Sequence, residues 1–227
     1  MKKVLLLLAI TTLVCACGGK NYYLAPTFKT RATAHKTVAV LPYDVVTNGK
    51  VPEGMTETRK KEIEEEETKA FQQSLYNGLV SNLGRSPIQI QAPNKTNNIL
   101  RTKGINMRDV GKSNPEDLAK ILGVDAVVFA TVTKYRYMDD KAAMGIGLGK
   151  SVLSSVTRGQ SNLYTSGVSS KTNDVKVTCS LIDAKTGEVL WKINSDTEVD
   201  WNRTSNVVID RVNGRLSESF PYKTLKN

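Results

Sequence analysis

The chain has 227 residues, of which 40% are hydrophobic and 24% charged. This composition is typical of one soluble globular domain, and it excludes a chain that is disordered or membrane-spanning throughout. The net charge of +10 suits an acidic neighbour such as acidic lipid, peptidoglycan or nucleic acid. The basic residues are scattered rather than gathered on a recognition helix, so we expect no nucleic-acid partner.

The amino terminus has the pattern of an export signal. Lys2 and Lys3 precede an apolar run from Val4 to Val14. This run is too short to cross, as a helix, a hydrocarbon core of about 30 Å. The sequence therefore predicts a cleaved signal rather than a membrane span.

The residues that follow the apolar run indicate where the signal is cut. The small Ala16 before Cys17 suits cleavage by a signal peptidase. The run resembles the bacterial lipobox, whose cysteine is linked to diacylglycerol and becomes the first mature residue. Cys17 matches that position, whereas Cys15 follows the bulky Val14 and does not. A plain secretory signal with an incidental cysteine is the alternative. We expect a signal peptide over residues 1–16 and lipidation at Cys17.

Residues 17–36 are polar and small, with Pro26 and no periodicity, and are expected to form a flexible tether. The folded domain is expected over residues 37–222, with a Gly/Ser-rich insertion at about 139–173. Gly18 stands where Asp would resemble an inner-membrane retention signal. We therefore expect anchoring in the outer membrane through the lipid on Cys17, with the domain facing the periplasm.

The inventory of reactive residues argues against catalysis. If Cys15 is removed and Cys17 acylated, Cys179 is the one free thiol left, and its strand-like surroundings predict a small buried hydrophobe. The single histidine, His35, lies in the expected tether. No Ser/His/Asp or metal-ligand spacing converges. We expect no enzyme activity, no cofactor and no catalytic or metal site.

The first half of the domain predicts strands and helices in alternation. A strand is expected over Thr37–Tyr43, followed by a loop through residue 54 and a long helix over Thr56–Leu83. Apolar residues recur in that helix at four-residue steps. Its carboxylates at 64–67 point to different sides, which predicts a solvated face rather than a cation site. Pairs Lys61–Glu65 or Glu65–Lys69 are expected to support the helix.

Further elements follow the long helix. The sequence predicts a short strand over Ser86–Gln91 and a helix over Asn94–Lys103. A capping box from Ser113 to Glu116 is expected to open the next helix, which Gly123 ends. The run Val124–Tyr137 is apolar in its first half and alternates in its second, so it predicts the central strand of the sheet.

The last third predicts a hairpin and a helix. Residues 174–200 alternate around the turn Asp183–Gly187, where Gly187 is free to take positive φ. A final helix starts near Ser205 and is closed by Pro221. Strands that alternate with helices predict an α/β fold: a single domain with a mixed β-sheet flanked by helices.

The insertion allows three interpretations. Residues 145–151 resemble a phosphate loop, but Met144 occupies the position of the required first glycine. Large residues alternate with glycine over residues 144–152, the pattern of a transmembrane hairpin contributed to a barrel by an oligomer. The return arm is much weaker. We favour a Gly/Ser-rich loop, or a short helix over 151–156, over the membrane hairpin.

Three segments carry a resemblance to known proteins. They are Thr37-Val-Ala-Val-Leu-Pro-Tyr, Leu122-Gly-Val-Asp-Ala-Val-Val-Phe-Ala-Thr-Val-Thr-Lys-Tyr, and Val177-Thr-Cys-Ser-Leu-Ile-Asp-Ala-Lys-Thr-Gly-Glu-Val-Leu-Trp. In this order they resemble the envelope-lipoprotein superfamily of the curli secretion channel (CsgG-like) and the penicillin-binding-protein activator (LpoB-like). The shared domain of that superfamily is similar to the TolB amino-terminal domain. The resemblance implies a non-enzymatic lipoprotein that acts through protein–protein contacts in envelope assembly or maintenance. The alternative is a CsgG-like oligomeric secretion channel that uses residues 142–170 as a membrane hairpin, so a homo-oligomer stays open.

Overall fold

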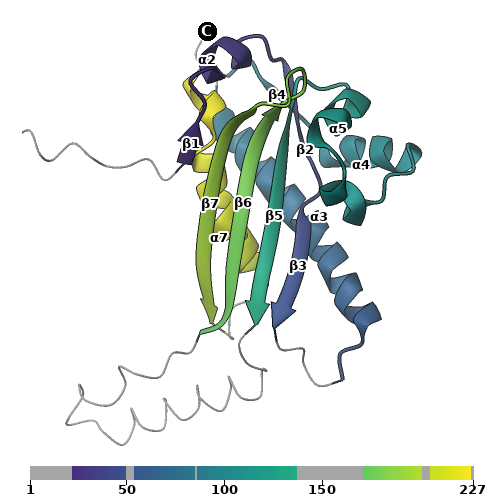
Figure 1. Cartoon of the computed structure of the whole chain (residues 1–227). Helices are drawn as coiled ribbons and strands as arrows, with labels where there is room; N and C mark the ends of the chain where they lie inside the picture. Colours follow the sequence, from purple (N-terminus) through teal and green to yellow (C-terminus); the bar gives the residue numbers. More distant parts are fainter. Residues whose placement is uncertain (1–21, 50–53, 85, 137–170, 201–204, 226–227) are drawn as a thin grey trace, which may run out of the picture.

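The computed structural model describes residues 22–49, 54–84, 86–136, 171–200 and 205–225 (Figure 1). They form a seven-stranded mixed sheet with the order β1-β7-β6-β5-β2-β4, in which β3 also pairs with β5. Helices cover both faces of this sheet (Figure 1). The expected fold class, a single α/β domain with a mixed sheet flanked by helices, is confirmed.

Strand β5, Ala126–Arg136, lies inside the sheet as predicted. One of its edges pairs antiparallel with β6, Lys171–Asp183. Its other edge pairs in parallel with β2, Thr37–Val40, and then with β3, Asp44–Gly49. Pro42 lies between β2 and β3, where it cannot donate to a ladder. The loop that we expected after Tyr43 is wrong over Asp44–Gly49, because pairing with a strand far along the chain orders this segment.

The predicted hairpin is confirmed. It consists of β6 and β7, Val189–Asp200, joined by a turn in which Gly187 has φ of 69°. Strand β6 begins at Lys171, three residues earlier than expected. Residues 171–173 therefore belong to the sheet and not to the expected insertion. The rest of that insertion, with the phosphate-loop-like run and the candidate membrane hairpin, lies outside the described residues.

Two helices cover one face of the sheet and form the larger core. They are α3, Glu57–Leu83, whose N-cap is Thr56, and α7, Ser205–Glu218, after which a short 3-10 turn, η2, spans Pro221–Thr224. The predicted apolar stripe of α3 is buried against the strands. The largest buried side chains of this core are Tyr43, Phe71, Leu75, Leu79, Leu181, Leu190, Trp191, Phe220 and Tyr222.

A smaller core covers part of the second face. It lies beneath α4, Pro93–Thr102, the 3-10 helix η1, Met107–Lys112, and α5, Pro115–Leu122. Short strand β4, Gln89–Gln91, pairs with β2 and is shorter than predicted. The expected capping box is wrong by one residue. Asn114, not Ser113, is the N-cap of α5 and accepts the backbone N–H of Glu116.

The rest of the second face carries polar side chains from β3, β5, β6 and β7. Thr133 lies between Val46 and Lys176 in the strand register, and Lys176 lies beside Asp196. Val46 is 43% exposed and Tyr135, two residues after Thr133, is 46% exposed. Within the described part of the chain, α4, η1 and α5 pack on this face over the smaller core, which lies at the other half of the face.

The expected tether of residues 17–36 is wrong from Tyr22 onward. Strand β1, Tyr22–Leu24, pairs antiparallel with β7, and helix α2, Phe28–Ala32, follows it. Phe28 is buried and its ring contacts Tyr222 edge-on at 5.6 Å between centroids. These elements are too short to show a period, and residues more than 150 positions away hold them in place.

The carboxylates at 64–67 are more than the solvated face that we expected. The Glu64 carboxylate accepts a hydrogen bond from the backbone N–H of Thr47 and so satisfies this donor on the outer edge of β3. Glu67 forms an ion pair with Lys134 of β5. The expected Glu65–Lys69 pair is confirmed, with 3.1 Å between Oε1 and Nζ.

Among the helices described, none combines the length and apolar character that a membrane crossing requires.

Candidate binding groove and the polar clusters around it

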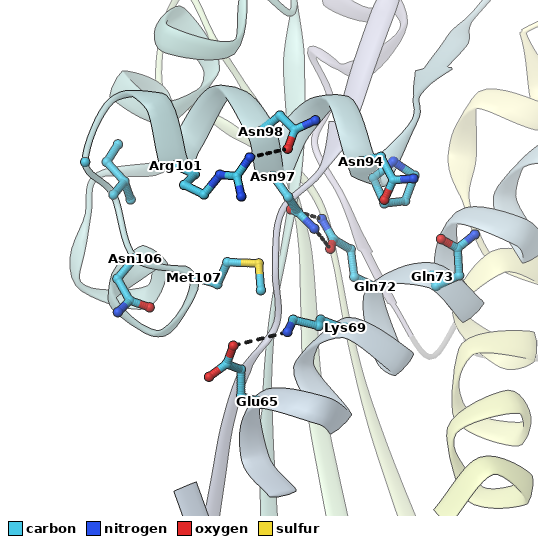
Figure 2. Close-up of a pocket in the computed structure, with 13 residues that line it drawn as sticks. Glu65, Lys69, Gln72, Gln73, Asn94, Asn97, Asn98, Arg101, Asn106 and Met107 are labelled. Carbon is cyan, nitrogen blue, oxygen red and sulfur yellow. Dashed lines mark hydrogen bonds and ion pairs between the residues drawn. The ribbon is translucent and has the colours of Figure 1, made fainter. Parts of the chain in front are cut away.

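A polar groove with a volume of about 700 Å³ lies between α3 and α4. Helix α3 forms one side of it, α4 forms the other, and the segment from α4 into η1 closes one end (Figure 2). Most of the lining side chains are carboxamides or charged groups: Glu65, Lys69, Gln72, Gln73, Asn94, Asn97, Asn98, Arg101 and Asn106. Binding sites for small molecules are usually lined mainly by apolar groups, so this lining is unusual.

Helix α4 points its polar side chains into the groove because its other side is buried. Pro93 occupies the first turn, where its missing N–H costs nothing. Thr96 and Leu100 are buried on the same side, and Leu100 belongs to the smaller core. Asn94, four residues before Asn98, therefore lies with it on the opposite side of the helix.

A pair of carboxamides joins the two helices at the floor of the groove. Gln72 Nε2 donates to Asn97 Oδ1 at 3.0 Å, and Asn97 Nδ2 donates back to Gln72 Oε1 at 2.9 Å (Figure 2). The same Gln72 amide donates to the carbonyl oxygen of Val40 in β2 at 2.8 Å. Gln72 is only 1% exposed. This pair therefore fixes the spacing of α3, α4 and the sheet.

The rim of the groove has hydrogen-bonding groups that the described residues leave unused. Asn94 is exposed and its side chain makes no hydrogen bond with any described residue. Asn98 uses its carbonyl oxygen to accept from Arg101 at 3.3 Å, and Asn106 uses its own to accept the backbone N–H of Arg108. The amide nitrogens of Asn98 and Asn106 are left to donate to a ligand.

Cations outnumber carboxylates at the groove. Glu65 lies between Lys69, at 3.1 Å, and Arg108, at 4.0 Å. The Arg101 guanidinium contacts the neutral amide of Asn98 and has no carboxylate partner in the described part of the chain. Among the residues that line the groove, two cations, Lys69 and Arg101, thus face the single carboxylate of Glu65, which leaves the lining positive.

A second polar cluster lies where the chain enters the sheet, and it is buried. His35 Nε2 and Asp183 Oδ2 are 3.0 Å apart, and His35 Nδ1 hydrogen bonds with the Tyr222 hydroxyl. His35 is 7% exposed, Asp183 3% and Tyr222 0%. This placement corrects the expectation that His35 belongs to a tether. The cluster ties the segment before β2 to the hairpin turn and to η2.

Hydrogen bonds hold the Asp183 carboxylate in its charged form. Burial by itself would raise the pKa of Asp183, but the donors that surround it lower that pKa below its ordinary value. These donors are His35, the hydroxyl and backbone N–H of Thr186, and the backbone N–H of Lys185. Burial raises the pKa of Tyr222 well above its ordinary value. The Asp-Ala-Lys-Thr-Gly turn therefore has a structural role: it holds a buried, charged carboxylate in place.

The described residues contain no reactive thiol and no group of metal ligands. Cys179 is buried in β6, and burial strongly raises the pKa of its thiol, which keeps it protonated and unreactive. Cys17 lies outside the described residues, so its lipidation stays a prediction. In the described ranges, no three His, Cys, Asp or Glu side chains are grouped as a metal site would require.

Sequence reasoning predicted the helix over Asn94–Lys103 but missed the groove beside it. The available signal was a polar row on one side of that helix, opposite its apolar row. The polar row consists of Asn94, Asn98 and Arg101. It shows which side of the helix is polar but not which other element faces that side. The facing helix lies about 25 residues earlier in the chain, and only the fold brings the two together.

Comparisons with known proteins found similar chains among solved structures, all at low sequence identity. No family model matches the chain, and no curated protein matches it. Lipoprotein GNA1162 from Neisseria meningitidis is similar in structure, with 14% identity, a TM-score of 0.43, and coverage of 80% of this chain and 94% of that one. The PelC dodecamer from Paraburkholderia phytofirmans has 12% identity, a TM-score of 0.43, and coverage of 90% and 96%.

LpoB from Escherichia coli is also similar, with 12% identity, a TM-score of 0.40, and coverage of 79% of this chain and 67% of that one. The LpoB-like part of the sequence resemblance thus has a counterpart among solved structures. The CsgG-like and TolB-like parts stay predictions. At these identities and TM-scores the similarities carry no argument about function.

Proposed function

We propose that this chain is a lipid-anchored protein of the bacterial envelope that acts by binding another protein and not by catalysis. The observation that carries the proposal is the groove between α3 and α4. It exposes unused carboxamide groups and cations on helices whose spacing Gln72 and Asn97 fix. Polar groups that are held in place but left unpaired are prepared for a ligand that supplies the missing partners.

The anchor in this proposal is Cys17. Two or three acyl chains, palmitate among them, stabilise membrane attachment by about 0.8 kcal/mol for each buried methylene, which gives stable anchoring. Tyr22, which is already paired in strand β1, lies five residues after Cys17. Five residues span at most roughly 18 Å. The lipid would therefore hold the domain close to the headgroups, whereas a tether of residues 17–36 would have allowed a distance on the order of 70 Å.

The location in this proposal is the outer membrane, with the domain facing the periplasm. Removal of residues 1–16 removes Lys2 and Lys3, so the charge falls from +10 to 10 − 2 = +8. A basic domain held near the membrane suits acidic lipid headgroups and acidic envelope proteins. The buried states of His35 and Cys179 support a role without nucleophilic or acid–base chemistry.

The anchor is tested by mass spectrometry and fractionation of the full chain expressed in a bacterial host. We expect a mature chain that begins at an acylated Cys17 and sediments with the outer membrane. Cys17→Ser should release the protein into the soluble envelope fraction. An unmodified amino terminus in the wild-type protein would overturn the anchor.

The binding role is tested separately, by photo-cross-linking in intact cells. A photoreactive residue in place of Gln73, which lines the groove, should give a discrete adduct with one other protein. The same residue in place of Asn77, one turn further along α3, is the control and should not give that adduct. Equal labelling from both positions would contradict a specific contact at the groove.

A further inference from the structure

We infer that the groove between α3 and α4 binds an extended, acidic segment of a partner polypeptide. This inference deepens the proposed function and rests on it, because it names the chemistry of the partner. Three features of the groove support it: the carboxamides of the rim, the charge of the lining and the preorganised floor.

Carboxamides suit a peptide backbone because each offers one acceptor and two donors, which match the N–H and C=O of a peptide unit. Asn94 and Asn98 are separated by one helical turn on α4, and Arg101 follows one turn later. A rise of 1.5 Å per residue spaces Asn94 and Arg101 by about 10.5 Å. An extended chain advances about 3.3 Å per residue, so this row matches about three residues of an extended ligand.

Gln73 and Lys69 of α3 line the opposite side of the groove (Figure 2). Gln73 Nε2 donates to Asn77 at 2.9 Å, and its carbonyl oxygen accepts from no described residue. A ligand strand between the helices thus meets the Gln73 acceptor and the Lys69 donor on the α3 side, and the Asn98 amide donor on the α4 side. Met107 and Ile105 offer apolar contact at one end of the groove.

The charge of the groove selects an acidic ligand. Lys69 and Arg108 share Glu65, whereas Arg101 contacts only the amide of Asn98. A guanidinium without a carboxylate partner is well suited to a bidentate contact with an Asp or Glu of the ligand. A basic ligand would instead place its charge beside Arg101.

The floor of the groove supports recognition because it does not have to be ordered on binding. Gln72 makes three hydrogen bonds, two to Asn97 and one to Val40, and is almost fully buried. Preorganised groups lose little conformational freedom when a ligand arrives. Of the thirteen lining residues none is Phe, Tyr or Trp, which favours a polypeptide over a ligand that needs an aromatic stacking surface.

The test is calorimetric titration of the full lipidated chain in detergent micelles. The probe is a blocked decapeptide of alternating Asp and Ala, with the Lys–Ala and Asn–Ala decapeptides and an N-acetylglucosamine tetramer as comparison ligands. We expect saturable binding of the acidic peptide and at least tenfold weaker binding of the others. Arg101→Gln and Asn98→Asp should each weaken the acidic peptide roughly tenfold.

Lys95→Gln is the matched control, because it removes the same charge from α4 at an exposed side chain that does not line the groove. Its affinity should stay within about twofold of wild type. Circular dichroism of each variant shows whether it is folded. Preference for the glycan, equal binding of all peptides, or self-association that Arg101→Gln abolishes would overturn the inference. If the acidic peptide does not bind although Cys17 is acylated and the groove cross-link forms, this inference is wrong and the proposed function still stands.

Discussion

Two polar clusters of this molecule contain similar groups in opposite states. Around His35, Asp183 and Tyr222 the donors and acceptors satisfy one another and are buried. Along the groove between α3 and α4, the carboxamides of Asn94 and Asn98 are exposed and keep unused groups. Residue type therefore does not decide whether a polar cluster is structural or functional. What decides it is the fraction of the cluster's hydrogen-bonding groups that the fold itself satisfies.

The largest expected effect comes from breaking the buried cluster. His35→Ala removes the donor to Asp183 Oδ2 and the partner of the Tyr222 hydroxyl, both of them buried, and we expect the free energy of unfolding to fall by about 3 kcal/mol. Urea denaturation followed by circular dichroism measures it. Tyr222→Phe removes only the hydroxyl that bonds His35 Nδ1, and it should lower the free energy of unfolding by about 1 kcal/mol. Equal losses in the two variants would show that the cluster does not act as a network.

The groove offers a sharper comparison between neighbouring residues of one type. Gln72→Leu leaves Asn97 and the Val40 carbonyl unpaired, so we expect a loss of about 2 kcal/mol in unfolding free energy. Gln73→Leu changes an exposed side chain and should stay within about 0.5 kcal/mol of wild type. The same urea titration compares the two. A loss at Gln73 as large as that at Gln72 would contradict the division between floor and rim.

A smaller effect is expected from acid. The pKa of Asp183 is lower in the folded state than in the unfolded chain, so its charged form stabilises the fold above the unfolded pKa of about 3.9. That stabilisation is lost as the pH falls through the folded pKa. Asp183→Asn should therefore be less stable than wild type at neutral pH, with the difference narrowing below about pH 4. Thermal unfolding across pH measures the difference, and a constant difference would argue against this role of the carboxylate.

The smallest expected effect is a gain. Glu65→Gln removes the one carboxylate that lines the groove, so the acidic decapeptide should bind about threefold more tightly. Calorimetric titration reports the change. Glu62→Gln removes an exposed carboxylate one turn earlier on the same helix, where it pairs with Arg59, and is the control. An equal gain in both variants would point to net charge rather than to the groove.

The sequence predicted the long periodic elements well. Helix α3, strand β5 and the β6–β7 hairpin each repeat their pattern over many residues, so the period is visible locally. Strand β3, strand β1 and helix α2 were missed because each has six residues or fewer. Their stability comes from partners far along the chain: Tyr22 pairs with Ile193, and Asp44 with Thr131.

The candidate sites show the same limit. Cys17 could be proposed because an export signal is a local pattern. The turn at Asp183 was also predicted, but its histidine partner lies 148 residues away and could not be. The groove depends on α3 and α4 meeting side by side, a result of tertiary packing that no single segment contains.

The most direct test of this account is thermal unfolding of the full chain with and without the acidic decapeptide, for wild type and Arg101→Gln together. A ligand that binds only the folded state stabilises it by RT ln(1 + [L]/Kd) and so raises the unfolding temperature, which means that one experiment reports both stability and binding. The account predicts that the peptide raises the wild-type unfolding temperature and leaves that of Arg101→Gln nearly unchanged, while the two proteins unfold at the same temperature without peptide. An equal peptide-induced rise in both proteins, or a lower unfolding temperature for Arg101→Gln alone, would contradict it.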